Sequence, residues 1–340
     1  INGYHLTFKG TGTATTSQGT TAQTNIGDDQ SGNGNNFAVY NLAAHDVVPD
    51  SPENNFCTLN ENTRGTYPTL NEGALRINST YSADIAGVTS TWYMSSGKWY
   101  WEVHNEGATL TYPYLGITDQ RQTLFNSTRG SFYSVAWHRQ GTGQAHSGTS
   151  TFMGTITKNN VTSWTNDDII MFALDADARK LWVGKNGTWD GGGDPAAGSG
   201  EDASWTVNTA VSPSHMGYNG QGLGSVFNFG QDGTFANNQT AQGNADENGV
   251  GDFYYSPPSG YLAMAASNLP DPGIDPNGIS PENPTDYFNT LLYTGNGATN
   301  RSITGVGFAP DFVWLKCRSN AEDHGLSDTV RGATNKVEAN

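Results

Sequence analysis

The chain has 340 residues, with 16 Lys and Arg against 32 Asp and Glu, so its formal net charge is −16. This acidic balance argues against a nucleic-acid partner, which would need clustered basic residues. No run approaches the roughly 18 apolar residues of a membrane span, and no signal peptide is visible at the start, so membrane insertion is not expected.

The composition favours β-structure throughout. Aromatic residues make up 11% of the chain, and Thr, Gly and Asn recur along its whole length, which is typical of short strands joined by tight turns. No window shows the apolar spacing of an amphipathic helix. Cys57 and Cys317 lack the density of a disulfide framework and are expected to be small, reduced core residues.

Residues 1–49 are expected to form an N-terminal β extension. Tyr4–Phe8 is an apolar strand, and the polar tract Gly10–Gln23 is predicted to be a mobile loop. Gly27–Phe37 is rich in residues that tolerate positive φ, so it predicts a tight polar turn. Its side chains Asp28, Asp29 and Asn33 also offer oxygens to Ca²⁺. Their spacing does not match an EF-hand, so the structural turn is preferred and no metal site is assigned.

Residues 50–262 carry dense strand and turn signals without intervening helices, which predicts an antiparallel β-sandwich. The expected strands are Leu70–Asn78, Gly97–Val103, Tyr114–Thr118, Phe132–Trp137, Asp168–Asp175, Lys180–Gly184 and Ser225–Gly230. The fifth and sixth form a hairpin around an acidic turn. Strand side chains alternate, so Trp99 and Trp101 are expected on one face. With Trp137 and Trp182 they are expected in the core.

Residues 263–285 are predicted to be an extended linker because their prolines exclude both helix and central strand. Residues 286–340 are predicted to begin a second β module with strands at Tyr287–Tyr293, Arg301–Val306 and Phe312–Lys316. Three strands cannot enclose much of a core, so this module is expected to be cut short and the chain to be a fragment of something longer.

Five motifs fall in the order seen in SPRY domains, which are concanavalin-A-like sandwiches of two antiparallel sheets. They are Gly97–Val103, Leu115–Ile117, Ser134–Trp137, Asp168–Gly187 and Phe227–Gln231. The resemblance covers about residues 50–262. It implies the all-β sandwich fold, with the loops at one end of the sandwich forming a surface for a partner.

The flanking segments resemble a narrower group, the SPRY-containing tail-fibre proteins of tailed bacteriophages, marine ones especially. Asn2–Leu6 with the turn Ser31–Phe37 is similar to the segment before the SPRY module. The segments similar to the following module are Asp286–Phe288, Tyr293–Gly297, Gly305–Trp314 and Val330–Gly332. The resemblance implies a virion protein made in the host cytoplasm, and a homotrimer.

No catalytic constellation is visible, so the chain is expected not to be an enzyme and to need no cofactor. Glu102 and Glu106 are the nearest carboxylate pair, but Glu106 falls in a turn and is expected to face away. Asp175 and Asp177 bracket a hairpin turn, where Asp is favoured for local bonding. The seven histidines show no zinc-binding spacing.

Binding is the better prospect, because sugars are held by aromatic faces and planar polar groups presented on loops. The long polar insertion from Trp189 to Trp205 and the stretch before the last strand supply such groups. The candidate ligand-binding residues are Trp189, Asp190, Trp205, Met216, Tyr218 and Asn219.

Three functions remain open at the level of the sequence. The preferred one is a phage adhesin or tail-fibre segment that attaches without covalent chemistry to the host surface, to a glycan or a protein. The alternative is a structural virion protein, a decoration or connector whose SPRY module binds another virion protein. A polysaccharide-cleaving tail enzyme is the third, and it would require a carboxylate pair in a groove.

Overall fold

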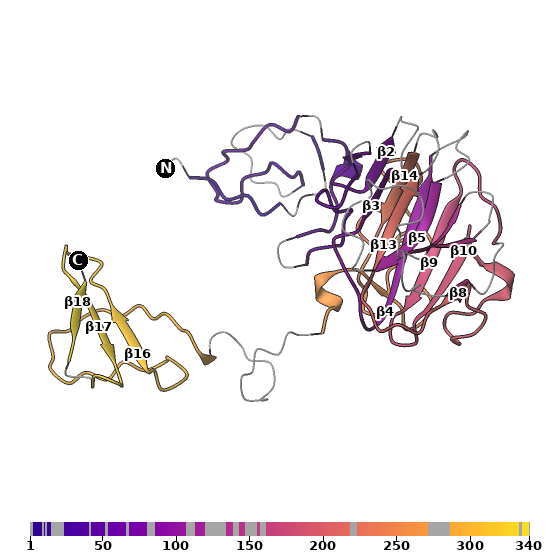
Figure 1. The fold of residues 1–340 in the computed structure, drawn as a ribbon. Coiled ribbons are helices and arrows are strands. Elements are labelled where there is room, and N and C mark those ends of the chain that lie inside the picture. Colours follow the sequence, from indigo (N-terminus) through magenta and orange to yellow (C-terminus); the bar gives the residue numbers. More distant parts are fainter. Residues whose placement is uncertain are drawn as a thin grey trace. The chain divides into compact units, whose positions relative to one another are not determined.

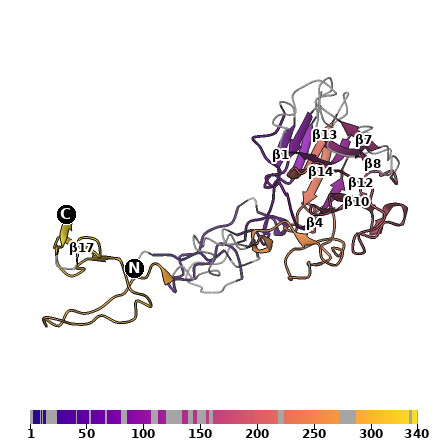
Figure 2. The same cartoon turned by 60° about the horizontal axis from the view of Figure 1, so that its bottom comes forward.

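A computed structural model describes residues 3–8, 10, 12–14, 24–40, 42–51, 54–65, 68–79, 86–106, 113–119, 134–138, 143–146, 155–156, 161–217, 223–270, 286–332 and 335–339. The chain divides into two compact units, Ile1–Asn268 and Leu269–Asn340. The first unit holds two mainly antiparallel sheets, and the second holds a small one (Figures 1 and 2). In the described part of the chain, no helix has the length and apolarity to cross a membrane.

The larger sheet of the first unit contains ten strands in the main order β1-β2-β14-β4-β9-β10-β12-β8, with β11 on β10 and β15 on β4. Their bounds are Thr69–Asn71 (β1), Arg76–Ser79 (β2), Lys98–Asn105 (β4), Thr155–Ile156 (β8), Ile169–Asp175 (β9), Lys180–Lys185 (β10), Thr188–Trp189 (β11), Ala203–Ser204 (β12), Leu223–Asn228 (β14) and Leu262–Ala263 (β15). The predicted hairpin of β9 and β10 is confirmed, with Lys180 opposite Asp175.

The smaller sheet of the first unit has five strands in the order β3-β13-β5-β6-β7. Their bounds are Ala86–Thr89 (β3), Pro113–Asp119 (β5), Ser134–His138 (β6), Gly143–His146 (β7) and Val211–Gly217 (β13). Leu115 and Trp137 of this sheet share one buried apolar cluster with Trp101 and Phe172 of the larger sheet. The two sheets therefore enclose a common core, and the predicted β-sandwich is confirmed.

Side chains of β4 alternate between two buried environments, as a strand requires. Trp99 and Trp101 belong to the core between the sheets, while Tyr100 lies in a second cluster with Trp182 and Phe253. Trp101 stacks on Phe172 at 5.1 Å between ring centroids. Trp99, Trp101, Trp137 and Trp182 are all buried, as predicted.

A segment with few strand residues covers the outer face of the larger sheet. We call residues 229–268 the cover segment. Phe253 and Tyr261 of this segment are fully buried against Tyr100 and Trp182 of the sheet. The short strand β15 pairs in parallel with β4, and a single 3₁₀ turn, η3 (Ala266–Asn268), follows it. The first unit therefore continues to Asn268, whereas the sequence placed its end at residue 262.

Several predicted elements differ in detail. Leu70–Asn78 is not one strand but the hairpin of β1 and β2, because Glu72, Gly73 and Ala74 take positive φ and reverse the chain. Tyr4–Phe8 contributes a single bridge from Leu6 to Asp29. Most of the tract Gly10–Gln23 lies outside the described residues.

The second unit contains a sheet in the order β16-β17-β18, with bounds Phe312–Leu315, His324–Asp328 and Val337–Ala339. Of the three strands predicted here, only the third is confirmed, because no residue of 287–293 or 301–306 belongs to a strand. Cys57 is free and buried as predicted, but Cys317 is only partly buried and is not a core residue.

Candidate functional site

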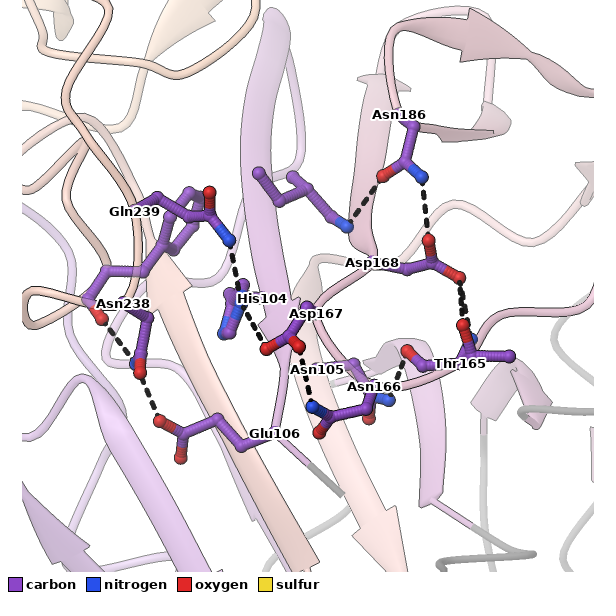
Figure 3. A network of polar contacts seen from close by, with 12 residues as sticks. His104, Asn105, Glu106, Thr165, Asn166, Asp167, Asp168, Asn186, Asn238 and Gln239 are labelled. Atoms are coloured by element: carbon purple, nitrogen blue, oxygen red, sulfur yellow. Dashed lines mark hydrogen bonds and ion pairs between the residues drawn. The ribbon is translucent and has the colours of Figure 1, made fainter. Parts of the chain in front are cut away.

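Polar side chains gather at one end of the larger sheet, where β4 ends, β9 begins and β10 turns into β11 (Figure 3). His104 pairs with Ile169 across β4 and β9, which brings the last residues of β4 beside the turn that precedes β9. We call this cluster the polar end. Its residues are His104, Asn105, Glu106, Thr165, Asn166, Asp167, Asp168, Asn186, Asn238 and Gln239.

Asp168 organises the half of the polar end that lies next to β10. Its carboxylate accepts hydrogen bonds from the Thr165 backbone N–H at 2.6 Å and from Asn186 Nδ2 at 2.7 Å. Burial raises the pKa of Asp168, but the bonds from Thr165 and Asn186 and the charge of Lys185 outweigh it, so the pKa is below its usual value. The group is an anion at neutral pH.

The Asn186–Gly187 turn joins β10 to β11. Both residues have positive φ, at 48° and 82°, which suits the two-residue turn between β10 and β11. Asn186 Oδ1 accepts the backbone N–H of Ile169 at 2.9 Å. The turn is thereby fixed to the start of β9.

His104 occupies the centre of the polar end and is 1% exposed. Its Nε2 lies 3.3 Å from Gln239 Nε2 and 3.6 Å from Asp167 Oδ1. Burial lowers the pKa of His104 although Glu106 and Asp167 pull it upward. A neutral imidazole whose Nε2 accepts from Gln239 fits this environment.

Glu106 lies in a chain of ion pairs. It contacts Arg76 at 2.7 Å, Arg76 contacts Glu72 at 3.1 Å, and Asn238 Nδ2 donates to Glu106 at 2.6 Å. Glu106 thus points into the polar end, whereas the sequence analysis expected it to face away. Its partner in the candidate carboxylate pair, Glu102, is fully buried beneath the cover segment.

Two tyrosines of the cover segment border the polar end. The Tyr255 ring packs on the Asn186–Gly187 turn, since a Cβ on Gly187 would lie 3.0 Å from that ring. Tyr254 and Tyr255 meet edge to face at 5.0 Å and are both half-buried. Burial, Tyr254, Glu102 and Asp168 together raise the pKa of Tyr255, so its hydroxyl stays protonated.

Four of the six ligand-binding residues proposed from the sequence, Trp189, Asp190, Trp205 and Met216, lie among the described residues. Trp205 and Met216 are 5% and 3% exposed. This corrects their assignment to exposed loops: Trp205 follows β12, which pairs with β10, and Met216 lies within β13. Tyr218 and Asn219 are outside the described residues.

Trp189 and Asp190 are the two of the four described candidates that are partly accessible. Trp189 is half-buried, with its ring 6.4 Å from that of Tyr100. Asp190 begins the short helix η2 (Asp190–Gly192) and accepts from both the N–H and the hydroxyl of Thr162 at 2.8 Å. This carboxylate anchors a loop.

The oxygens considered for Ca²⁺ are engaged by the protein itself. Asp29 accepts backbone N–H groups of His5, Ser31 and Asn35 at 2.8–2.9 Å. Asp28 accepts those of Thr24 and Asn25 at 3.0 and 2.8 Å, and Asn33 donates to the Gly3 carbonyl at 3.0 Å. These bonds are those of a structural turn.

One other group of side chains in the described residues has metal-ligating atoms close together. His45, Asp46 and Glu72 present donor atoms within 4.8 Å of one another. Neither this group nor the polar end was predicted from the sequence, because each combines segments that are distant along the chain. The Asn186–Gly187 turn and the polar run 165–168 before a strand were the local signals available for the polar end.

Comparisons with known proteins give the following likenesses. Residues 283–340 match the family model described as a domain of unknown function, DUF7483. A search of curated proteins finds no match.

Solved structures are similar over about half of the chain. The SPRY domain of human HERC1 is 18% identical with a TM-score of 0.35, covering 49% of this chain and 94% of that one. The TRIM65 PSpry domain is 11% identical with a TM-score of 0.32, covering 51% and 91%. Stonustoxin is 19% identical with a TM-score of 0.33, and the similarity spans 51% of this chain but 27% of the stonustoxin chain. The assignment of an antiparallel sandwich rests on the two sheets described above.

Proposed function

We propose that this chain is a host-attachment segment of a bacteriophage tail fibre, located in the virion, whose sandwich binds a host-surface glycan without cleaving it. The observation that carries the proposal is the polar end, where amides and carboxylates meet the half-buried Tyr254 and Tyr255. Planar amides and carboxylates pair with sugar hydroxyls, and aromatic rings pack on sugar C–H faces. Asp167 is accessible to a ligand, with a side chain 70% exposed.

The protonation states at the polar end support binding rather than hydrolysis. Glycoside hydrolysis needs a carboxylic acid whose pKa is raised, so that it can donate a proton. Asp168 has the opposite shift, and Glu106 is paired with Arg76 at 2.7 Å. Glu102 has a pKa raised to about 7 by burial, but its carboxylate is enclosed by Tyr254 and Tyr255.

A weak site at the polar end would suffice for attachment if several copies act together. Shallow polar sites give modest affinity, and linking sites raises avidity without new contacts. The homotrimer implied by the tail-fibre resemblance would provide three such ends.

The test is binding of the full-length protein to host cells and to their extracted surface polysaccharide, with release of reducing ends assayed in the same tube. The double variant Asn166→Ala/Asp167→Gly removes one half-buried and one exposed polar group, and glycine suits the φ of 66° at Asp167. We expect at least a tenfold loss of binding, about 1.4 kcal/mol or more. Glu61→Gly/Asn62→Ala is a matched pair of exposed residues away from the site.

Three results would contradict the glycan proposal. They are unchanged binding by the polar-end variant, equal loss in the matched control, and release of reducing ends. The last would establish the enzymatic alternative.

A specific observation favours the second candidate, a connector that binds another virion protein. The second unit exposes large apolar side chains: Phe288 is 74% exposed, Leu292 79% and Trp314 62%. Such exposure is typical of protein–protein contact surfaces. Binding of the purified chain to phage particles that lack it would support this role, and absence of such binding would count against it.

A further inference from the structure

We propose that His45, Asp46 and Glu72 form a binding site for a divalent transition-metal ion of the zinc class. His45 and Asp46 come from the short helix η1 (Ala44–Asp46), and Glu72 comes from the turn between β1 and β2. Their donor atoms lie within 4.8 Å of one another, and His45 Nε2 is 3.8 Å from Asp46 Oδ1. The site does not depend on the proposed glycan binding.

The three side chains face a pocket large enough for an ion with its water. The pocket has a volume of about 130 Å³, and a water needs roughly 10–15 Å³ on this measure. Asp50 and Asp232 also line it. Asp232 is 6% exposed and accepts the backbone N–H groups of Thr234 and Ala236. The pocket is therefore rich in negative charge, which favours a cation.

Each of the two carboxylates has an oxygen bound by another part of the protein. The Ala43 N–H donates to Asp46 Oδ2 at 2.6 Å, which leaves Oδ1 toward His45. Arg76 contacts Glu72 Oε1 at 3.1 Å. These contacts orient both carboxylates in the way that partners of metal ligands do.

The donor set selects the class of ion. One imidazole nitrogen and two carboxylate oxygens, with space for water, make three protein ligands and an open position, as in zinc sites of mixed N and O ligands. Ca²⁺ and Mg²⁺ prefer oxygen ligands alone. An ion here would join residues 45–46 to the β1–β2 turn and so stabilise the first unit.

The probe is Zn²⁺, added to the full chain after chelator treatment. We expect saturable binding of one ion per chain by calorimetry and a higher midpoint of thermal unfolding. His45→Asn/Asp46→Asn should weaken binding at least tenfold and abolish the thermal shift. This variant keeps the ion pair between Glu72 and Arg76, so the contact of Arg76 with Glu106 in the polar end is not disturbed. Glu72→Gln is the second test variant and keeps the assay informative if the first does not fold.

His5→Asn/Asp323→Asn is the matched control, since it also removes one histidine and one carboxylate, both from exposed positions. The control should bind Zn²⁺ like the wild type. The proposal is overturned if the wild type shows no saturable binding, or if the test variants bind as tightly as the control. It is also overturned if the wild type binds Ca²⁺ as tightly as Zn²⁺ and the His45→Asn/Asp46→Asn variant binds Ca²⁺ with the same affinity as the wild type.

Discussion

His215 lies on β13 with no exposed surface, and its environment sets a pH dependence for the whole fold. Burial lowers the pKa of His215 from 6.5 to about 3. Its Nε2 lies 3.3 Å from the Ser225 hydroxyl, and its Nδ1 has no hydrogen-bond partner in the described structure. The native state therefore holds this imidazole neutral while the unfolded chain protonates below pH 6.5.

The first prediction follows from that difference in proton binding. As pH falls below 6.5 toward 3, the unfolded state takes up a proton that the folded state refuses, so stability is lost. By pH 5 the loss from His215 is about 2 kcal/mol. Glu102, whose pKa is raised from 4.5 to about 7, acts in the opposite direction over the same pH range, so the test is the difference between variant and wild type. From pH 7 to pH 5, the free energy of unfolding in urea should change by about 2 kcal/mol more favourably in His215→Leu than in the wild type. An identical change in the two proteins would contradict the assignment.

Predictions about individual residues succeeded where the reason was local. The alternation of β4 alone determines that Trp99 and Trp101 share a face. Trp205 and Met216 were predicted wrongly because neighbouring Gly, Ser and Asn residues suggested loops, while their burial depends on pairing with distant strands. Local composition cannot report such pairing.

At the scale of elements, Glu102 holds the cover segment on the larger sheet. Its carboxylate accepts the backbone N–H groups of Tyr254 at 2.9 Å and Tyr255 at 2.7 Å. It also accepts the Tyr100 hydroxyl at 2.8 Å. All these partners are hydrogen-bond donors. An ionised carboxylate is purely an acceptor, so it can pair with every one of them.

The second prediction concerns Glu102→Gln. The amide NH₂ would face donors, so one or more bonds would be lost in a buried site, at a cost of about 2–4 kcal/mol. Hydrogen exchange should accelerate first at the Tyr254 and Tyr255 amides. Because burial raises the pKa of Glu102 from 4.5 to about 7, its contribution favours the folded state at low pH and declines as pH rises through that window. The variant should lack this decline. Unchanged exchange at both amides would count against the assigned role.

The third prediction concerns the close approach of β5 and β6 at Gly116. A Cβ there would lie 2.1 Å from the Val135 carbonyl oxygen and 2.6 Å from the Ala136 Cα. These are backbone atoms of a paired strand, so Gly116→Ala should destabilise the sandwich by about 3 kcal/mol. Gly295→Ala is the control, because nothing lies within 4 Å of the place that its added methyl group would take. Equal unfolding midpoints for both variants would contradict this account.

Elements were predictable from the sequence when their partners were adjacent along the chain. The β9–β10 hairpin has two apolar runs around an acidic turn, so its pairing is a local property. The sequence of Leu70–Asn78 was interpreted as a single strand. The positive φ angles of its central residues reverse the chain and make it a hairpin. The cover segment was missed because few of its residues form strands, and its burial comes from contacts with β4, β9 and β10.

At the scale of the whole molecule, the two units should be independent in stability. Both buried apolar clusters consist of residues between Phe56 and Ala265. The fourth prediction is that residues 1–268 produced alone unfold at the same midpoint as the first unit of the full chain, measured by calorimetry. A lower midpoint for the shorter chain would show that the second unit contributes to its stability.

The second unit leaves apolar side chains on both faces of its outer strand. All four residues of β16 are exposed, with Phe312 at 56% and Leu315 at 47%. A three-stranded sheet gains little stability when neither face is covered. Exposed apolar surface of this kind favours association through the hydrophobic effect.

The fifth prediction is that the full chain associates through β16. Sedimentation velocity should show its mean mass rising with concentration, and Phe312→Ser/Leu315→Ser should suppress that rise several-fold. Phe8→Ser/Tyr40→Ser removes two apolar side chains that are 66% and 80% exposed in the first unit, so it should leave the association unchanged. A wild-type chain that stays monomeric at all concentrations would contradict the prediction. If both variants suppress the association, it results from exposed apolar side chains in general. Only a loss of association confined to the β16 variant identifies this strand as the contact.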